Sequence, residues 1–207
     1  MRNQWRHYDL KLISEAMETI PDLTSNSKFT SYDKTGDETS HDYGKIYELD
    51  NDIKQLKIGA SQNQIDLLLQ LTGALTPPFY ILYVLVVTRL GNKQGRYQSP
   101  LFETKDELNN FLLEYKEYFE TDGRHHIWIC TIDNSGKFIY DQHNVIFAYG
   151  QLDNYISILK RNGYKEQMFS FPSPHAHAYN KSNDKFEESI LQSWDWSYFP
   201  LVESDKY

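Results

Sequence analysis

Apolar residues run without a break from 79 to 87, and this run organises the second half of the chain. It is far shorter than the ~20 residues that cross a bilayer. Pro77 and Pro78 precede it and force an extended chain. Continuous hydrophobicity of this length is typical of a strand that is covered on both faces. The pattern predicts a central strand over 79–88, with residues 96–99 pairing back on it as a short hairpin partner.

Residues 124–150 show the alternation of a β-hairpin that continues into a further strand. Ile127 and Ile129 lead to a polar turn at 133–136, where Gly136 can take a positive φ. Apolar residues resume at 138–140 and again at 145–149. Helical spacing of apolar residues and capping residues predict three helices around this hairpin. The first has Ser61 as its cap, the second begins with a capping box of Thr104 and Glu107, and the third spans 152–161. The second carries a single apolar stripe, made of Leu108, Phe111, Leu112, Tyr115, Tyr118 and Phe119.

The order of elements predicts the fold class. From residue 79 it reads strand, helix, strand, strand, helix, strand at 167–171, and then a C-terminal helix after 180–184. This is the β-α-β-β-α-β order of a ferredoxin-like antiparallel sheet over residues 79–179, in an α+β protein. Residues 8–20 have helical spacing, and the polar stretch 22–45 predicts a long loop. We therefore expect residues 1–60 to be an N-terminal extension of helix and loop packed on an α+β domain of 61–207, all as one structural unit.

Charge and composition narrow the partners. The formal net charge is −8 and no basic tail is present, which disfavours phosphate-binding functions such as nucleic-acid binding, and anionic membrane surfaces as well. A basic protein is the more compatible partner. The chain holds 16 tyrosines, which let a surface be apolar and still form hydrogen bonds. No apolar run follows the first residues, so no signal peptide is expected and a cytoplasmic location follows. Cys130, inside an apolar strand, is expected to be a buried small hydrophobe.

The candidate chemistry lies in histidine. His175 and His177 are two apart in a predicted extended segment, so both side chains point to one face. Asp141 and His143 would do the same in an extended chain. Together Asp141, His143, His175 and His177 would supply imidazole and carboxylate ligands to zinc or another divalent metal ion. The alternative is that these histidines only bond to the backbone or cap the edge of the sheet.

A second interpretation needs no metal. His143 or His175 would act as a general base, Asp141 would orient it, and Arg96 or Arg124 would hold an anion. The chain has no Gly-x-Ser-x-Gly elbow and no glycine-rich phosphate loop.

Two functional classes follow. The first is a non-catalytic protein-binding protein without a cofactor, which engages a basic partner; bacterial immunity proteins, which cap the active site of a toxin, share this general profile of size and composition. The second is a hydrolase, metal-dependent or not, with its site at Asp141, His143, His175 and either Arg96 or His177. Metal content of the purified protein discriminates between the two classes: a stoichiometric metal favours the enzyme, and its absence together with a partner recovered by pull-down favours the binding protein.

Overall fold

A nine-stranded, mostly antiparallel sheet forms the body of the protein in the computed structural model, which describes residues 27–205. The helix expected at 8–20 lies outside these residues. The sheet order is β10-β3-β4-β9-β8-β7-β5-β6-β12. The bounds of these strands are Ile46–Asp50 for β3, Gln55–Gly59 for β4, Phe79–Leu85 for β5, Gly95–Gln98 for β6, His125–Thr131 for β7, Gly136–Tyr140 for β8, Val145–Gly150 for β9, Lys165–Glu166 for β10 and Ser197–Phe199 for β12.

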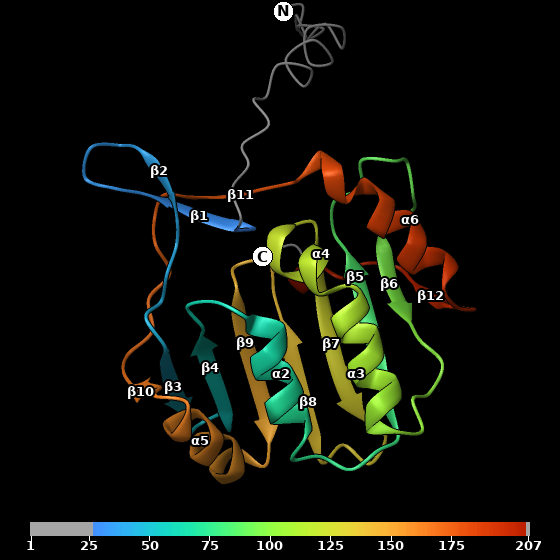
Figure 1. Ribbon diagram of the computed structural model, residues 1–207, viewed down its shortest axis with the longest axis horizontal. Coiled ribbons are helices and arrows are strands. Elements are labelled where there is room, and N and C mark those ends of the chain that lie inside the picture. Colours follow the sequence, from blue (N-terminus) through green and yellow to red (C-terminus); the bar gives the residue numbers. More distant parts are fainter. Residues whose placement is uncertain (1–26, 206–207) are drawn as a thin grey trace, which may run out of the picture.

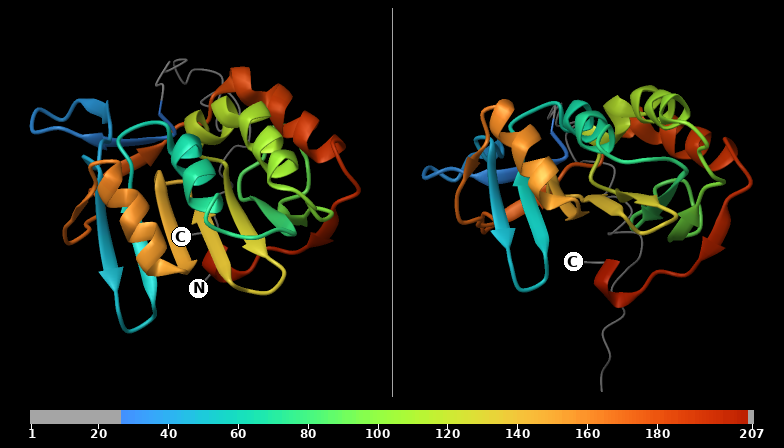
Figure 2. Two further views of the ribbon diagram at one scale, coloured as in Figure 1. Left: turned by 60° about the horizontal axis from the view of Figure 1, so that its bottom comes forward. Right: turned by 90° about the horizontal axis from the view of Figure 1, so that it is seen from below.

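Helices cover one face of this sheet, and the C-terminal segment lies against the other (Figures 1 and 2). The helices are α2 (Gln64–Thr72), α3 (Lys105–Glu114), α4 (Lys116–Thr121), α5 (Leu152–Arg161) and α6 (Asp184–Gln192), with two short 3₁₀ turns, η1 (Lys181–Asn183) and η2 (Glu203–Asp205). Within residues 27–205, no helix combines the length and the apolar character needed to cross a membrane.

The apolar run from residue 79 forms β5, an interior strand as predicted. It is hydrogen-bonded to β7 on one side and to β6 on the other, both antiparallel. Phe79, Ile81 and Tyr83 are fully buried in the main core cluster, whereas Tyr80 and Leu82 are only half-buried. The strand is therefore covered fully by the helices on one face and only in part on the other.

The ferredoxin-like strand order is not confirmed. In that order, β5 and β7 would be parallel and separated by another strand, because a right-handed crossover joins them. Here they are direct antiparallel neighbours, with Ile81 opposite Ile129. The cause is the extra strand β6, which pairs antiparallel with β5 before α3 begins. The chain then enters β7 in the direction opposite to β5, whereas a direct strand-helix-strand crossover would make the two parallel. The coarser prediction, an α+β protein with a large antiparallel sheet, is confirmed.

Local signals were reliable at one predicted capping box and misleading at the other. Thr104 accepts a hydrogen bond from the backbone N–H of Glu107, and the Glu107 side chain accepts one from the N–H of Thr104, so α3 begins as predicted. The helix after Ser61 instead begins at Gln64, and its cap is Asn63 with a left-handed φ of 57°. Asn tolerates that conformation better than most residues, and it moves the start of the helix past Ser61.

The turn before β8 also departs from expectation. The positive φ of this turn belongs to Asn134, at 57°, and not to Gly136. Gly136 is needed for space, because a Cβ atom there would lie 2.5 Å from a methyl carbon of Leu75 and 2.8 Å from the hydroxyl of Tyr155. The glycine thus lets Leu75, just after α2, and Tyr155 of α5 pack close to the sheet.

A second, smaller sheet stands at one end of the body, where sequence patterns predicted a polar loop. It has the order β11-β1-β2, with β1 at Phe29–Tyr32, β2 at Glu38–Ser40 and β11 at His175–His177. The hairpin of β1 and β2 projects from the body (Figure 1). The strand expected at 167–171 is absent; two residues before it form β10, and β11 follows after it. Strands β3 and β4 fall in the expected 1–60 extension, yet they belong to the main sheet, so the two expected parts share one structure.

Candidate functional site: a histidine centre

The turn between β8 and β9 holds the first histidine. One carboxylate oxygen of Asp141 accepts hydrogen bonds from the backbone N–H groups of His143, at 2.9 Å, and Val145, at 3.0 Å. The other oxygen lies 2.7 Å from Nδ1 of His143. Asn144 completes the turn with a φ of 62° and accepts a hydrogen bond from the hydroxyl of Tyr140 at 2.8 Å. Asp141 and His143 therefore meet through a tight turn, not through the extended chain that the sequence suggested.

Strand β11 holds the other two histidines. It pairs antiparallel with β1, with His175 opposite Ser31 and His177 opposite Phe29. Nδ1 of His175 lies 2.9 Å from the carbonyl oxygen of Pro172, and Nδ1 of His177 lies 3.2 Å from that of Gln142. A carbonyl oxygen can only accept, so each Nδ1 donates. In the neutral ring, Nε2 then keeps a free lone pair.

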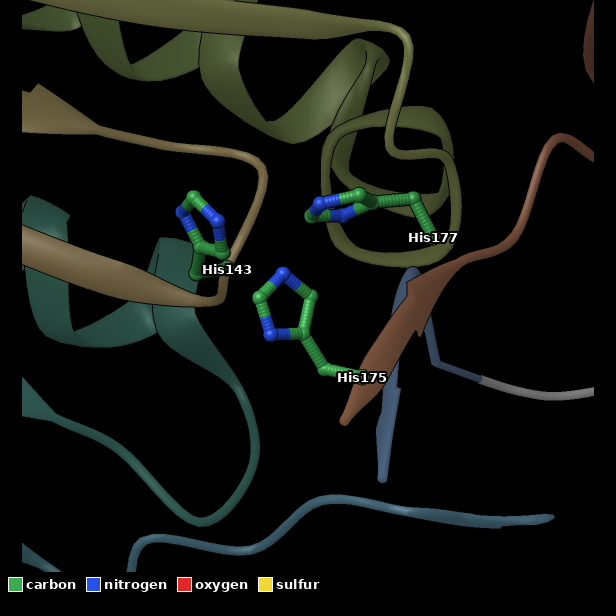
Figure 3. A group of neighbouring side chains, drawn as sticks. All are labelled: His143, His175 and His177. Carbon is green, nitrogen blue, oxygen red and sulfur yellow. The ribbon is translucent and has the colours of Figure 1, made fainter. Parts of the chain in front are cut away.

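The three rings converge. One ring nitrogen from each of His143, His175 and His177 lies within 4.8 Å of the others. Figure 3 shows the rings directed toward a common centre, with a nitrogen of each on the inner side. Their centroids are separated by 5.4 Å, 4.9 Å and 5.5 Å, and Phe29 packs against all three at 5.3 to 5.6 Å. The structure therefore brings His143 together with His175 and His177, whereas Asp141, the fourth residue proposed for the site, lies behind His143 and outside this group of three. We call this group the histidine centre.

Burial and neighbouring groups act on the pKa values of His177 and Asp141. Burial lowers the pKa of His177 to about 4, and the neighbouring His143 and His175 lower it further in the same direction. Burial acts to raise the pKa of Asp141, but the hydrogen bond and charge of His143 outweigh it, and the pKa lies below its usual value. At neutral pH His177 is therefore an uncharged ring with a lone pair, and Asp141 is an ionised acceptor behind His143.

Two arginines named as anion-holding candidates are engaged elsewhere. Arg96 forms two hydrogen bonds with Asp205, at 2.8 Å and 2.6 Å. Arg124 is fully buried and bonded to Asp122 and Glu187, each at 2.7 Å. Both guanidinium groups hold parts of the chain together, so neither is offered to an anion at the histidine centre.

His125 and His126 lie on opposite faces of β7, as strand alternation predicts. His125 is buried on the helix side against Tyr118, with ring centroids 4.4 Å apart. His126 faces the side of the sheet without helices, and burial lowers its pKa. Cys130 follows on that face, buried as expected, and burial raises the pKa of its thiol. Burial thus keeps the thiol protonated and disfavours Cys130 as a nucleophile.

An open cavity of about 460 Å³ lies beside the histidine centre on the face of the sheet opposite the helices. His143 belongs to both the cavity and the centre, and Asp141, which bonds to His143, also lines the cavity. The remaining lining side chains come from four strands, the loop before β11 and the C-terminal segment, and they are Gln55, His126, Trp128, Ile139, Phe147, Tyr149, Phe171 and Ser204. The centre is therefore connected to a space in which a small molecule fits.

Sequence reasoning missed the residues that support the centre. Phe29 lies in a stretch that was expected to be a loop. The backbone carbonyl groups of Gln142 and Pro172 could not be predicted, because the pattern of side chains along the sequence does not indicate which carbonyl groups bond to a histidine. Phe171 packs on His143 with ring centroids 5.2 Å apart, and it was placed in a strand that does not form. Only the three-dimensional pairing of β1 with β11 brings these groups to the site.

Comparisons of the chain with protein-family models, with curated proteins and with solved structures find no match. The geometry of the site is therefore the basis for a functional proposal.

Proposed function

We propose that this protein is a metal-dependent hydrolase whose metal ion is held by His143, His175 and His177. One observation carries the proposal: each Nδ1 is occupied by an oxygen acceptor, while the ring nitrogens gather within 4.8 Å. Metal-binding histidines in proteins usually donate their second N–H to a carboxylate or a carbonyl in this way, which fixes the tautomer and the ring orientation. The centre has one carboxylate and two carbonyl groups in that role.

Zinc is the ion that fits this donor set best. It takes imidazole nitrogens at about 2.0–2.1 Å, and a tetrahedral arrangement puts such nitrogens about 3.4 Å apart. The widest pair here would have to close by roughly 1.4 Å from 4.8 Å. His175 is the exposed member of the three, so packing restrains its side chain least.

Three protein ligands leave a fourth position for water, which is the pattern of catalytic zinc sites. At such a site, the pKa of a bound water would be lowered and a carbonyl group would be polarised, and both effects promote hydrolysis. The open cavity next to His143 gives a substrate access to that position.

Metal content of the full-length protein tests the ion. The protein is stripped with a chelator, loaded with zinc, desalted and measured by plasma mass spectrometry. We expect one zinc per chain, and less than a tenth of that in His175→Ala and His177→Ala. His41→Ala is the matched control, because His41 also contacts Phe29, at 5.7 Å, but is not among the three converging rings. A variant series with unchanged zinc content would refute the centre.

Hydrolysis of 4-nitrophenyl acetate tests the activity. The zinc-loaded protein should release nitrophenolate faster than the stripped protein, and the two variants should fall to the stripped rate while His41→Ala does not. Equal rates with and without zinc would remove the hydrolase proposal even if zinc binds.

The protein-binding function is a second candidate, and the projecting hairpin favours it. Strand β2 is exposed along its length, and its outer edge is unpaired among residues 27–205. Acidic side chains at Asp33, Asp37 and Glu38 surround it. An exposed edge of this kind can pair with a strand of a partner, and the negative charge suits a basic protein such as the toxin of an immunity pair.

Salt dependence tests this candidate once a partner is in hand. Steering by opposite charge should slow association as ionic strength rises from low to physiological. A rate that does not change with salt would remove the charge-based argument for a basic partner.

A further inference from the structure

Two polar atoms on side chains that line the cavity have no hydrogen-bond partner in the described part of the chain. They are Nε2 of His126 and Nε1 of Trp128, and both are buried. An unpaired buried polar group destabilises a protein, so nearly all such groups are paired in native structures. Trp128 Nε1 can only donate, and therefore it requires an acceptor atom. A molecule in the cavity that presents an oxygen or nitrogen acceptor would pair with Trp128 Nε1.

The walls of the cavity specify the rest of that molecule. Trp128, Phe147 and Tyr149 stand on alternate positions of two strands and share the face without helices, and Phe171 closes one side. Flat aromatic walls favour a planar aromatic ring, through offset or edge-to-face contacts. The ligand therefore needs an aromatic body.

A positive charge lies beside the rings of this wall, on Lys137, which does not itself line the cavity. Nζ of Lys137 is 4.2 Å from the centroid of the Tyr149 ring and 5.5 Å from that of Trp128. Lys137 forms no ion pair with residues 27–205. By contrast, Asp141, the carboxylate of the cavity, is already satisfied by His143 and two backbone N–H groups. The charge available to a ligand is positive, which favours a carboxylate or an oxygen that becomes negative during a reaction.

The C-terminal segment forms the remaining side. Asp205 is buried and tied to Arg96 by two hydrogen bonds, which fix the η2 turn so that Ser204 borders the cavity. The cavity is therefore built from four neighbouring strands of the main sheet, the loop before β11 and the C-terminal segment, and is not a gap at one loose loop.

We propose that this cavity binds the acyl part of an aromatic ester, with the carbonyl oxygen accepting a hydrogen bond from Trp128 Nε1 and the carbonyl carbon toward His143. The proposal rests on the proposed hydrolase function and names its substrate class. An N–H donor at the carbonyl oxygen also stabilises the negative charge that develops there during attack.

The reaction balances with water alone. The oxygen of a water molecule that has lost one proton forms a bond to the carbonyl carbon, and the bond from that carbon to the alkoxide oxygen breaks. The alkoxide takes up the proton, so that one ester and one water give an aromatic acid and an alcohol. Because the acid ionises at neutral pH, the product is an arenecarboxylate, which suits the charge of Lys137.

Binding of benzoate to the zinc-free, full-length protein tests the cavity without relying on the metal. Benzoate is titrated while the indole N–H signals are followed by ¹⁵N nuclear magnetic resonance, and the Trp128 signal is assigned with Trp128→Phe. We expect that signal to shift on binding and Trp128→Phe to bind benzoate at least tenfold more weakly. Phe keeps an aromatic ring in the wall and removes the donor, together with the second ring of the indole. Trp194→Phe is the matched control, because Trp194 packs against Phe102 and Phe111 in the layer of helices and should leave the affinity unchanged.

Cyclohexanecarboxylate is the matched ligand control, with the same charge and a ring that is not flat, and it should bind at least fivefold more weakly than benzoate. Absence of benzoate binding, or equal affinity of wild type and Trp128→Phe, would overturn the substrate assignment. The two proposals fail separately. Benzoate binding by a protein that takes no zinc removes the hydrolase and keeps an aromatic-acid site. Zinc-dependent ester hydrolysis without benzoate binding keeps the hydrolase and removes this substrate class.

Discussion

The carboxylate of Asp141 lies 2.7 Å from Nδ1 of His143, and it also accepts hydrogen bonds from the backbone N–H groups of His143 and Val145 in the same turn. One side chain thus fixes both the backbone and the ring of His143. Such a residue acts on a metal ion through its ligand and not by direct contact, which makes its substitution informative.

Asp141→Asn should weaken zinc binding about 10- to 100-fold, as removal of a carboxylate behind a histidine ligand usually does. Asn keeps an oxygen acceptor for the turn, so the fold should persist. Competition with a chromogenic zinc chelator measures the affinity. Asp133→Asn, in the exposed turn before β8, is the control, because Asp133 accepts a backbone hydrogen bond from Ser135 in a similar way. Equal zinc affinity in wild type and Asp141→Asn would contradict the role given to Asp141.

Phe111→Ala should lower the free energy of unfolding by about 3–5 kcal/mol, the usual effect of truncating a buried aromatic residue. Phe111 is 4% exposed and packs against Phe102, Tyr115 and Trp194. Leu113→Ala on the same helix, where the side chain is 50% exposed, should lower it by less than about 1 kcal/mol. Urea unfolding measures both. Similar losses for the two variants would show that α3 does not bury the predicted stripe.

Arg124→Met should lower the free energy of unfolding by about 3–5 kcal/mol, because Asp122 and Glu187 would be left buried without their partner. Arg89→Met is the control. Arg89 pairs with Asp184 at 3.2 Å on a partly exposed surface, where an ion pair contributes about 0–1 kcal/mol. The experiment is again urea unfolding, at constant pH. A small loss for Arg124→Met would mean that water reaches the two carboxylates.

Lys28 should make stability depend on pH. Burial lowers its pKa from 10.5 to about 7, although Asp141, Glu120 and Asp122 act in the opposite direction. Between pH 7 and 10.5 the unfolded chain therefore binds more protons at this position than the folded protein does. The contribution of Lys28 to the free energy of unfolding should rise with pH across that window, by at most about 1.4 kcal/mol per pH unit, and stay at its lowest value below pH 7.

Urea unfolding of wild type and Lys28→Met at pH 7, 8 and 9 measures this slope. Nζ of Lys28 lies 3.4 Å from the centroid of the Tyr140 ring and has no hydrogen-bond partner among residues 27–205, so Met replaces it with little loss of contacts. The difference between the two proteins should change with pH. The same comparison with Lys34→Met, in the exposed turn after β1, should give parallel curves. Parallel curves for Lys28→Met would exclude the buried amine as the cause.

Sequence patterns predicted those parts of the fold that depend on near neighbours. The apolar run of β5 and the reciprocal bonds of Thr104 and Glu107 need no distant residue to be recognised. The failures come from pairing across long separations. Strand β1 is only four residues long, and it pairs with β11, almost 150 residues away. Strands β5 and β7 pair directly because the chain reverses at β6, and neither hydrophobic period nor strand propensity predicts that reversal.

The candidate site was likewise predicted only where its residues are close together in the sequence. Alternation placed His175 and His177 on one face, and proximity in sequence paired Asp141 with His143. That the two pairs meet depends on where β11 docks, and the sequence alone left this open. The carbonyl groups that orient the rings could not be predicted, since every residue has one.

Two of the three histidines stand on the small sheet and the third on a turn of the large one. An ion bound by all three would cross-link the two sheets, joining segments that are otherwise far apart in the chain. Chelation should then accelerate amide hydrogen exchange and proteolysis in the β1–β2 hairpin more than in the central strands. Metal supply would in this way set how firmly the exposed edge of β2 is presented, and the catalytic and the partner-binding candidates would be linked by the same ion.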